Sequence, residues 1–328
     1  MCRNEMDLIK EKKITKKYKN IMITQSLYSL ALYIFVNKNL ESDTLFLLGD
    51  NINYESIKME LSNFIIYDVR SAGPKNITEW MLLSKGVIFG RFKKINKYIN
   101  VDTVIYGHDH ISLSPLFFKR EMIIIEDGLS NYTENYNDLT RNQKIKKILN
   151  IKFKTKGYSE ATKIIYLTGM SKIPDELINK VRLVNRKDFI KGLKSILNGV
   201  FYSELKIKRK AQLLITQPLS EDNFISESQK ILIYKKLIDK DLILIIKPHP
   251  RELTDYKKHF KNAIVINNEK LAESLFDNDN VTDIYTIFSS ALISYPFERN
   301  VNVHIKGTMN NNSLISKVGF VEEQEIIH

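Results

Sequence analysis

Cysteine is nearly missing from this sequence. Its one cysteine, Cys2, excludes an intrachain disulfide and a cysteine-rich zinc module. Proteins without disulfides are typical of a reducing cytosol, so we expect a cytoplasmic protein.

Long apolar segments are missing as well. The apolar run at residues 21–36 is interrupted by Gln25, Ser26, Tyr28 and Ser29, and it is too short to cross a bilayer. The first twenty residues are charged and do not form a targeting peptide. We therefore expect a soluble protein, or one that contacts the inner face of the cell membrane only peripherally.

Acidic residues are too few to balance the basic ones. The chain has 50 Lys and Arg against 38 Asp and Glu, a net charge of +12. Such a surface attracts nucleic acid, an anionic leaflet or a phosphorylated ligand. Lysine-rich stretches at residues 10–19, 144–156 and 206–210 are compatible with an anionic leaflet, although solvated helix faces and loops are more typical. An aromatic-plus-basic RNA-binding motif is absent, so we expect no nucleic-acid partner, and nucleic-acid binding remains the alternative from a different class.

Short aliphatic runs alternate with helical patterns along the chain. Strands are predicted at residues 21–24, 44–50, 63–68, 103–107, 122–128, 212–218, 242–247, 263–266 and 283–287. Alternation of this kind indicates an α/β fold with parallel sheets. The length of 328 residues allows two Rossmann-like domains, at residues 1–205 and 206–328, that face a central cleft. The last residues are expected to cross back to the first domain.

The segment at residues 242–252 is the clearest candidate for chemistry. Five aliphatic residues lead into Lys-Pro-His-Pro-Arg-Glu, which predicts a buried strand that ends at a proline. Pro248 and Pro250 restrict the backbone on both sides of His249. The carboxyl ends of parallel strands border the ligand crevice of α/β sheets, and Lys247 and Arg251 add positive charge there. This grouping predicts a phosphate site in which His249 is protonated and acts as an acid.

Two further predicted strands end in polar residues. Glu126 and Asp127 precede Gly128, where a carboxylate could take a proton from an acceptor hydroxyl. Ser289 and Ser290 are expected to begin a helix, and their hydroxyl and N–H groups suit a phosphate.

The Gly-His-Asp-His segment at residues 107–110 follows another predicted strand. With the Gly-Asp-Asn segment at residues 49–51 it matches part of the metallophosphoesterase pattern, but the early Asp-x-His and the Gly-Asn-His of those enzymes are missing. We therefore expect His108 and His110 at the acceptor side or cleft. The Asp-Asn-Asp segment at residues 277–279 matches a metal-binding Asp-x-Asp, but its position favours a turn. No metal ligand is assigned.

The order of these segments resembles that of bacterial sialyltransferases with the GT-B fold. The acidic-Gly segment at 126–128, the His-Pro segment at 247–252 and the Ser-Ser pair at 289–290 correspond to the motifs of those enzymes, and residues 214–222 resemble a further motif of glycosyltransferase family 52. That family contains lipooligosaccharide and capsule α-2,3-sialyltransferases. The resemblance covers about residues 20–300. It implies CMP-N-acetylneuraminate as donor, inversion at the anomeric carbon, and neither a cofactor nor a metal.

The resemblance also implies roles for individual residues. His249, together with Lys247 and Pro250, would bind the CMP phosphate, and Ser289 and Ser290 would hold the same group. Thr216 and Gln217 of the further motif would lie on the donor side.

The catalytic base stays open between the acidic-Gly motif, with Glu126 or Asp127, and Asp222. A base should be partly buried but reachable, which favours Asp127. The acceptor would be a galactose-terminated glycan, lipid-linked or not, and a homodimer is compatible with the sequence. A transferase with another nucleotide sugar is the alternative within the fold.

Overall fold

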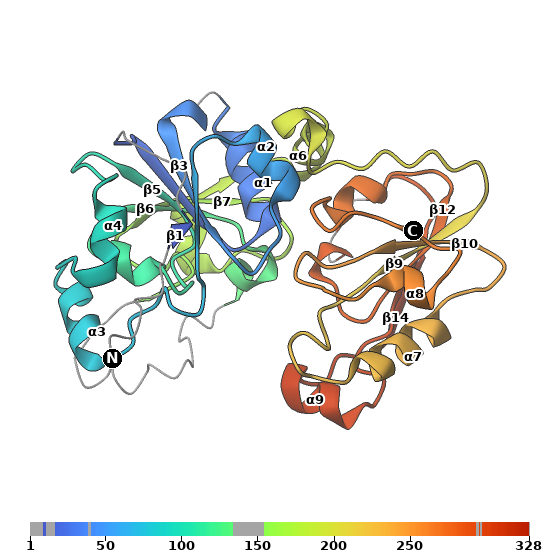
Figure 1. Ribbon diagram of the computed structural model, residues 1–328. Helices are drawn as coiled ribbons and strands as arrows, with labels where there is room; N and C mark the ends of the chain where they lie inside the picture. Colours follow the sequence, from blue (N-terminus) through green and yellow to red (C-terminus); the bar gives the residue numbers. More distant parts are fainter. Residues whose placement is uncertain are drawn as a thin grey trace. The chain divides into compact units, whose positions relative to one another are not determined.

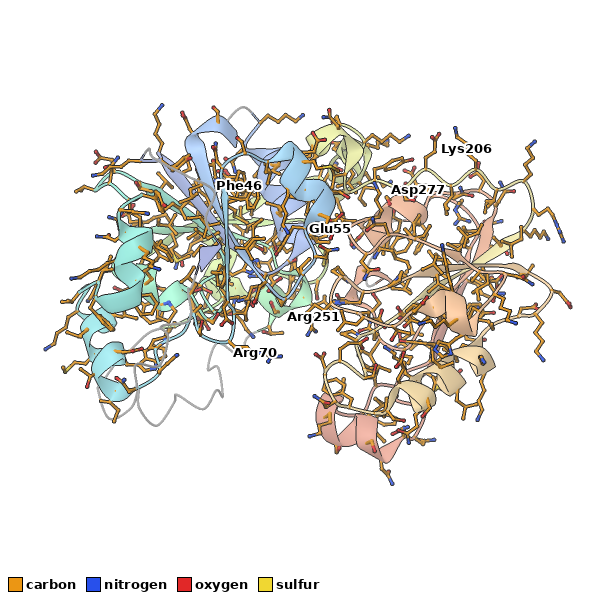
Figure 2. All side chains as sticks on the ribbon, in the orientation of Figure 1. Phe46, Glu55, Arg70, Lys206, Arg251 and Asp277 are labelled. Carbon is orange, nitrogen blue, oxygen red and sulfur yellow. The ribbon has the colours of Figure 1, made fainter. Side chains whose placement is uncertain are left out.

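The computed structural model describes residues 9–10, 17–38, 41–133, 154–292, 295 and 297–327. The chain divides into two compact units, residues 1–192 and 193–328. The predicted domain boundary at residues 205–206, next to Lys206 in Figure 2, therefore falls inside the second unit. Within the described residues, no helix combines the length and the apolar character that a membrane span requires.

Unit 1 is built on one eight-stranded sheet of order β1-β4-β3-β2-β5-β6-β7-β8. Its strands are β1 (Ile9–Lys10), β2 (Asn20–Thr24), β3 (Thr44–Gly49), β4 (Phe64–Tyr67), β5 (Val104–Gly107), β6 (Met122–Ile125), β7 (Thr162–Leu167) and β8 (Val181–Leu183). All neighbouring strands are parallel except β1, which pairs antiparallel with β4. Strands β2 and β3 are buried on both faces because their central residues are apolar; Phe46 of β3 (Figure 2) is fully buried.

The helices of unit 1 cover both faces of this sheet (Figure 1). They are α1 (Leu27–Val36), α2 (Glu55–Glu60), α3 (Ile77–Ser84), α4 (Lys93–Asn96) and α6 (Arg186–Gly192). Helix α1 packs on β2, β5, β6 and α6. Ser26 caps its first turn by accepting a hydrogen bond from the backbone N–H of Ser29. The strand-helix alternation predicted for this half of the chain is therefore confirmed.

Unit 2 contains a six-stranded sheet of order β11-β10-β9-β12-β13-β14. Its elements are β9 (Ala211–Ile215), α7 (Glu227–Leu237), β10 (Ile243–Lys247), α8 (Tyr256–His259), β11 (Ile264–Val265), β12 (Val281–Thr286), β13 (Asn302–Ile305), α9 (Asn312–Val318) and β14 (Gln324–Ile327). Only β14 runs antiparallel, beside β13. The C-terminal strand thus belongs to the sheet of unit 2, whereas we expected the tail to return to the first domain.

Each sheet has one point at which the strand order reverses. In unit 1, β3 and then β4 are added on one side of β2 in the sheet. The chain then returns, and β5, β6, β7 and β8 are added on the other side of β2. In unit 2 the same reversal separates β9, β10 and β11 from β12. Such reversals are where open α/β sheets bind ligands, outside the carboxyl ends of their strands. The two reversals define where the functional side chains should be sought.

Candidate functional site

Three of the predicted segments meet at the strand reversal of unit 2. Ile215 at the end of β9 is level with Lys247 of β10 and with Thr286 of β12. The chain therefore leaves the sheet at one edge in the segments at 216–217, 248–250 and 287–290. The sequence motifs that lie far apart in the chain are neighbours here because parallel strands end on the same side.

His249 lies directly after β10 and is partly buried. Its Nδ1 accepts a hydrogen bond from the backbone N–H of Arg251 at 3.1 Å, so the ring hydrogen of the neutral form is on Nε2. Burial, followed by the charges of Arg251 and Lys247, lowers the pKa of His249 to about 3. This direction runs against the expectation that His249 is held protonated, because burial first, and then the neighbouring cations, favour the neutral ring.

Arg251 is paired with Asp222 in a two-pronged ion pair. Its guanidinium donates to Oδ1 at 2.7 Å and to Oδ2 at 3.1 Å. Asp222 lies in the turn after β9, and about a quarter of its side chain is exposed. Arg251, labelled in Figure 2, thus joins the Asp222 turn to the His249 loop within unit 2. Asp222 stays reachable from solvent while its charge is compensated.

Two of the residues expected to bind donor have other partners. Thr216 is fully buried, and its hydroxyl donates a short hydrogen bond to Glu252. Lys247 is also buried, and its ammonium donates to the carbonyl oxygens of Pro248 and Asn268. Burial lowers the pKa of Lys247 to about 8. Neither side chain presents a polar group to a ligand in this structure, so both support the loop from inside.

A buried ion network that sequence reasoning missed fixes the His249 loop. Glu252 accepts from the backbone N–H of His249 at 2.7 Å and from the Tyr256 hydroxyl at 2.6 Å. Lys230 of α7 lies 3.3 Å from Glu252 and 2.9 Å from Glu221. Glu252 lies three residues after His249, a spacing at which a side chain can accept a hydrogen bond from a loop N–H. This spacing was the only signal for Glu252 in the sequence.

The Ser-Ser pair follows β12 but does not begin an α-helix. Ser289 is buried, and its hydroxyl accepts from the backbone N–H of Ala291 at 3.3 Å. Ser290 is exposed and starts a single 3₁₀ turn at Ser290–Leu292. The predicted helix is thus reduced to one turn. Gln217 is partly buried, and its backbone N–H donates to the Tyr234 hydroxyl at 2.8 Å.

The strand reversal of unit 1 gathers the remaining candidates. Gly107 is level with Ile23 of β2 and with Ile124 of β6, so the segments at 108–110 and 126–127 leave the sheet at the same edge. The His108 and His110 rings stack with centroids 5.5 Å apart. Asp127 Oδ2 lies 3.2 Å from His110 Nε2 and 3.6 Å from His108 Nδ1. The acidic-Gly and Gly-His-Asp-His motifs therefore form one cluster.

The two adjacent carboxylates of this cluster have opposite environments. Glu126 is fully buried and accepts from the Tyr132 hydroxyl at 2.7 Å and from the Thr168 hydroxyl at 2.8 Å. Burial raises its pKa. A group enclosed in this way holds the loop at 168–170 and cannot reach an acceptor. Of the two carboxylates in the acidic-Gly motif, only Asp127 is accessible, with about a quarter of its side chain exposed.

His108 and His110 differ in charge. Burial lowers the pKa of His108 to about 4, so its ring is neutral at pH 7. Burial acts in the same direction on His110, but hydrogen bonds with Asp109 and Asp127 outweigh it and raise the pKa of His110 to about 9. Burial raises the pKa of Asp127, yet the neighbouring histidines prevail and the net pKa is below its usual value. His110 and Asp127 therefore form an ion pair.

The segment at residues 277–279 is a turn, as its position predicted. Of the other lysine-rich stretches, residues 11–16 and 144–153 lie outside the described residues, as does most of the polar stretch at 132–161.

Two Rossmann-like units, each with polar groups at a strand reversal, give the protein an α/β fold of the GT-B class. The model of glycosyltransferase family 52 matches residues 51–307, and the chain belongs to this family. An uncharacterized protein of Haemophilus influenzae is 38% identical over 235 residues, which cover 67% of this chain and 74% of that protein.

Solved structures of UDP-N-acetylglucosamine 2-epimerases resemble the chain more distantly. The enzyme of Methanocaldococcus jannaschii is 14% identical, with a TM-score of 0.39 over 84% of this chain and 79% of that one. A putative epimerase of Listeria monocytogenes is 11% identical, with a TM-score of 0.42 over 84% of this chain and 75% of that one.

Proposed function

We propose that this glycosyltransferase is an inverting sialyltransferase. It moves N-acetylneuraminic acid from CMP-N-acetylneuraminate to a terminal galactose of a bacterial capsule or lipooligosaccharide. Membership of family 52 supports this proposal, because the His-Pro and Ser-Ser segments are those by which the chain resembles sialyltransferases of that family. The observation that carries it is the meeting of Gln217, His249 and the Ser289–Ser290 pair at one edge of the unit 2 sheet.

The donor phosphate would bind at the His249 loop. Because Nδ1 of His249 accepts from the Arg251 backbone, Nε2 carries a hydrogen that can be donated even when the ring is neutral. Ser290, which is exposed, adds a hydroxyl, and Pro250 restricts the loop. An anionic phosphate would in turn raise the pKa of His249, so that the ring can give a proton to the leaving group.

The transfer itself needs a base and a stabilised leaving group. The acceptor oxygen forms a bond to the anomeric carbon while the bond from that carbon to the phosphate oxygen breaks, and CMP leaves with the electron pair. The base takes the acceptor proton, and either Asp127 or Asp222 can fill this role since both are partly exposed. Hydrogen bonds from His249 stabilise the charge on CMP, so no cation is required at the donor phosphate.

The remaining partners follow from charge. We propose a cytoplasmic enzyme that binds a glycan acceptor, and this acceptor is either free or linked to a lipid. Basic side chains at residues 206–210 are exposed or partly exposed and suit the anionic leaflet at which such acceptors are assembled. A homodimer is compatible with this arrangement.

The donor proposal predicts selective binding of CMP. In EDTA, we expect CMP to raise the melting temperature of the full chain by several degrees at saturating concentration, because a ligand at about 100 times its Kd stabilises by about 2.7 kcal/mol. UMP, UDP and GDP should shift it much less. His249→Ala should abolish the CMP shift, whereas His259→Ala, which removes an exposed histidine of the same unit, should preserve it.

The alternatives predict other outcomes of the same measurement. A larger shift with UDP or GDP, or a shift that requires Mg²⁺, would move the proposal to another nucleotide sugar. Salt-dependent binding of random oligonucleotides, without a CMP shift, would instead favour a nucleic-acid-binding protein.

A further inference from the structure

Three side chains of unit 1 converge with the spacing of metal ligands. One atom each of His108, His110 and Asp127 lies within 4.8 Å of the other two. Asp127 Oδ2 is 3.2 Å from His110 Nε2 and 3.6 Å from His108 Nδ1. Ligands at about 2.0–2.2 Å from a tetrahedral Zn²⁺ are themselves about 3.3–3.5 Å apart. The two distances from Asp127 bracket that separation, and the two histidine nitrogens lie within 4.8 Å of each other.

His108 has a buried nitrogen that lacks a partner. The Ser29 hydroxyl donates its hydrogen to the carbonyl oxygen of Glu126 at 2.5 Å, so it accepts from His108 Nε2–H at 2.8 Å. Nδ1 of the neutral ring then carries a lone pair. In the part of the chain that the structure describes, this fully buried Nδ1 has no hydrogen-bond partner. It is directed toward the Asp127 carboxylate, and two electron-rich atoms at this distance repel unless a cation lies between them.

A second layer of groups orients the same side chains. His110 Nδ1 lies 3.6 Å from Asp109, which places a carboxylate behind the imidazole. Asp109 is itself held by the backbone N–H groups of Lys156 and Gly157, at 2.6 and 2.8 Å. Carboxylate and hydroxyl groups behind histidines are the usual supports of metal-bound imidazoles. Ser29 is hydrogen-bonded to His108, and the Asp109 carboxylate lies at ion-pair distance from His110.

We propose that His108, His110 and Asp127 bind a divalent transition-metal ion, with Zn²⁺ as the best fit. Two imidazoles and one carboxylate suit Zn²⁺ better than Mg²⁺ or Ca²⁺, which prefer oxygen ligands. His110 and Asp127 are partly exposed and provide a route from solvent. Three protein ligands leave a fourth position for water or a ligand oxygen. This site is independent of the donor site, but a bound ion would occupy Asp127 and leave Asp222 as the base.

The test is metal binding by the full chain, without an affinity tag and after removal of metals by EDTA and desalting. We expect calorimetry with ZnCl₂ to give one ion per chain, and Co²⁺ to produce the visible absorption of a four-coordinate site. His108→Ala and Asp127→Asn should each weaken binding at least tenfold. Asp109→Asn should weaken it about 10- to 100-fold through the supporting layer. His259→Ala, which removes an exposed histidine, is the matched control and should bind as the parent does.

Binding below one ion per chain, or binding that Asp127→Asn and His108→Ala leave unchanged, would overturn the proposal. Circular dichroism shows whether each variant folds. Asp127 is partly exposed, so Asp127→Asn tests the site even if the variant of the buried His108 does not fold. CMP-dependent stabilisation of the same samples reports on the donor site separately. Loss of that stabilisation with zinc binding intact would contradict only the sialyltransferase proposal.

Discussion

His249 lies among cations, and its protonation state follows from this setting. Arg251 and Lys247 are its charged neighbours, and the ring is partly buried, so its pKa is about 3. In the proposed phosphate site, the flanking cations would act only through their charge, while the histidine would contribute an N–H donor. Under the proposed function, a bound donor phosphate would compensate the cations and raise the pKa of His249, which would couple donor binding to activation of the acid.

The depressed pKa of His249 makes folding stability depend on pH. Its folded pKa lies below its unfolded value of about 6.5, so its contribution is complete above pH 6.5 and is lost as pH falls toward 3. Between pH 7 and pH 5 we expect the parent to lose about 1–2 kcal/mol more unfolding free energy than His249→Asn. Urea denaturation at both values measures this difference. Equal losses in the parent and the variant would mean that the folded histidine titrates normally; His259→Asn is the control.

Glu126 and Asp127 show how strongly position divides two adjacent carboxylates. Glu126 points into the core, where three donors from Tyr132 and Thr168 surround it. Asp127 points outward to His110. The sequence named both as possible bases because an acidic pair after a strand does not reveal which side chain is enclosed. Glu126 therefore serves the structure, and only Asp127 of this pair is accessible to a ligand.

At the scale of elements, the end of β5 depends on one glycine. Gly107 has φ of 121°, and a Cβ added there would lie 1.9 Å from the Ile23 carbonyl oxygen. His108 donates its backbone N–H to the same oxygen at 3.3 Å. Close approach of β5 to β2 at the strand reversal therefore positions His108, and it requires a residue without a side chain.

Gly107→Ala should destabilise unit 1 by more than about 3 kcal/mol, because the new methyl group meets a backbone carbonyl that cannot move without breaking the sheet. Gly169→Ala is the matched control. Gly169 also has positive φ, but nothing lies within 4 Å of its added Cβ, so only conformational strain of about 1–2 kcal/mol is expected. Guanidinium denaturation compares the two variants. Similar midpoints would show that the close contact at Gly107 is relieved easily.

The elements were predictable where aliphatic runs are continuous. β2, β3 and β10 were expected within one residue at each end and β9 within three, because strands buried on both faces are mostly apolar. β8, β13 and β14 were not predicted. β8 and β14 are edge strands, and the side chains of β14 are exposed, so their sequences carry no burial pattern. β13 alternates with polar Asn302 and His304 and was not recognised as part of the sheet.

At the scale of the whole molecule, the two candidate bases belong to different units. Asp127 lies in unit 1, and Asp222 lies in unit 2 with His249. A base in unit 1 would mean that catalysis needs both units, whereas a base in unit 2 would place the acid and the base in one.

Separate replacement of the two aspartates decides between these possibilities. We expect one of Asp127→Asn and Asp222→Asn to lower kcat for transfer from CMP-N-acetylneuraminate by about 10²- to 10⁴-fold, the usual contribution of general-base catalysis. The other should change it much less. Steady-state assays in EDTA, with CMP binding measured in parallel, exclude effects of a bound ion or of lost donor affinity. Losses below about tenfold in both variants would contradict general-base catalysis by either residue.

The sequence by itself determined the class of the fold, the two-unit organisation and the polar segments that follow the strands, because burial pattern and strand-end motifs are local properties of a chain. It did not determine which side chains of those segments face a ligand. Tertiary structure alone turned Thr216, Lys247 and Glu126 inward and brought the histidines of one segment beside the aspartate of another. The direction of a side chain and its distance from other side chains depend on strand order and register, because these bring together residues that lie far apart in the sequence.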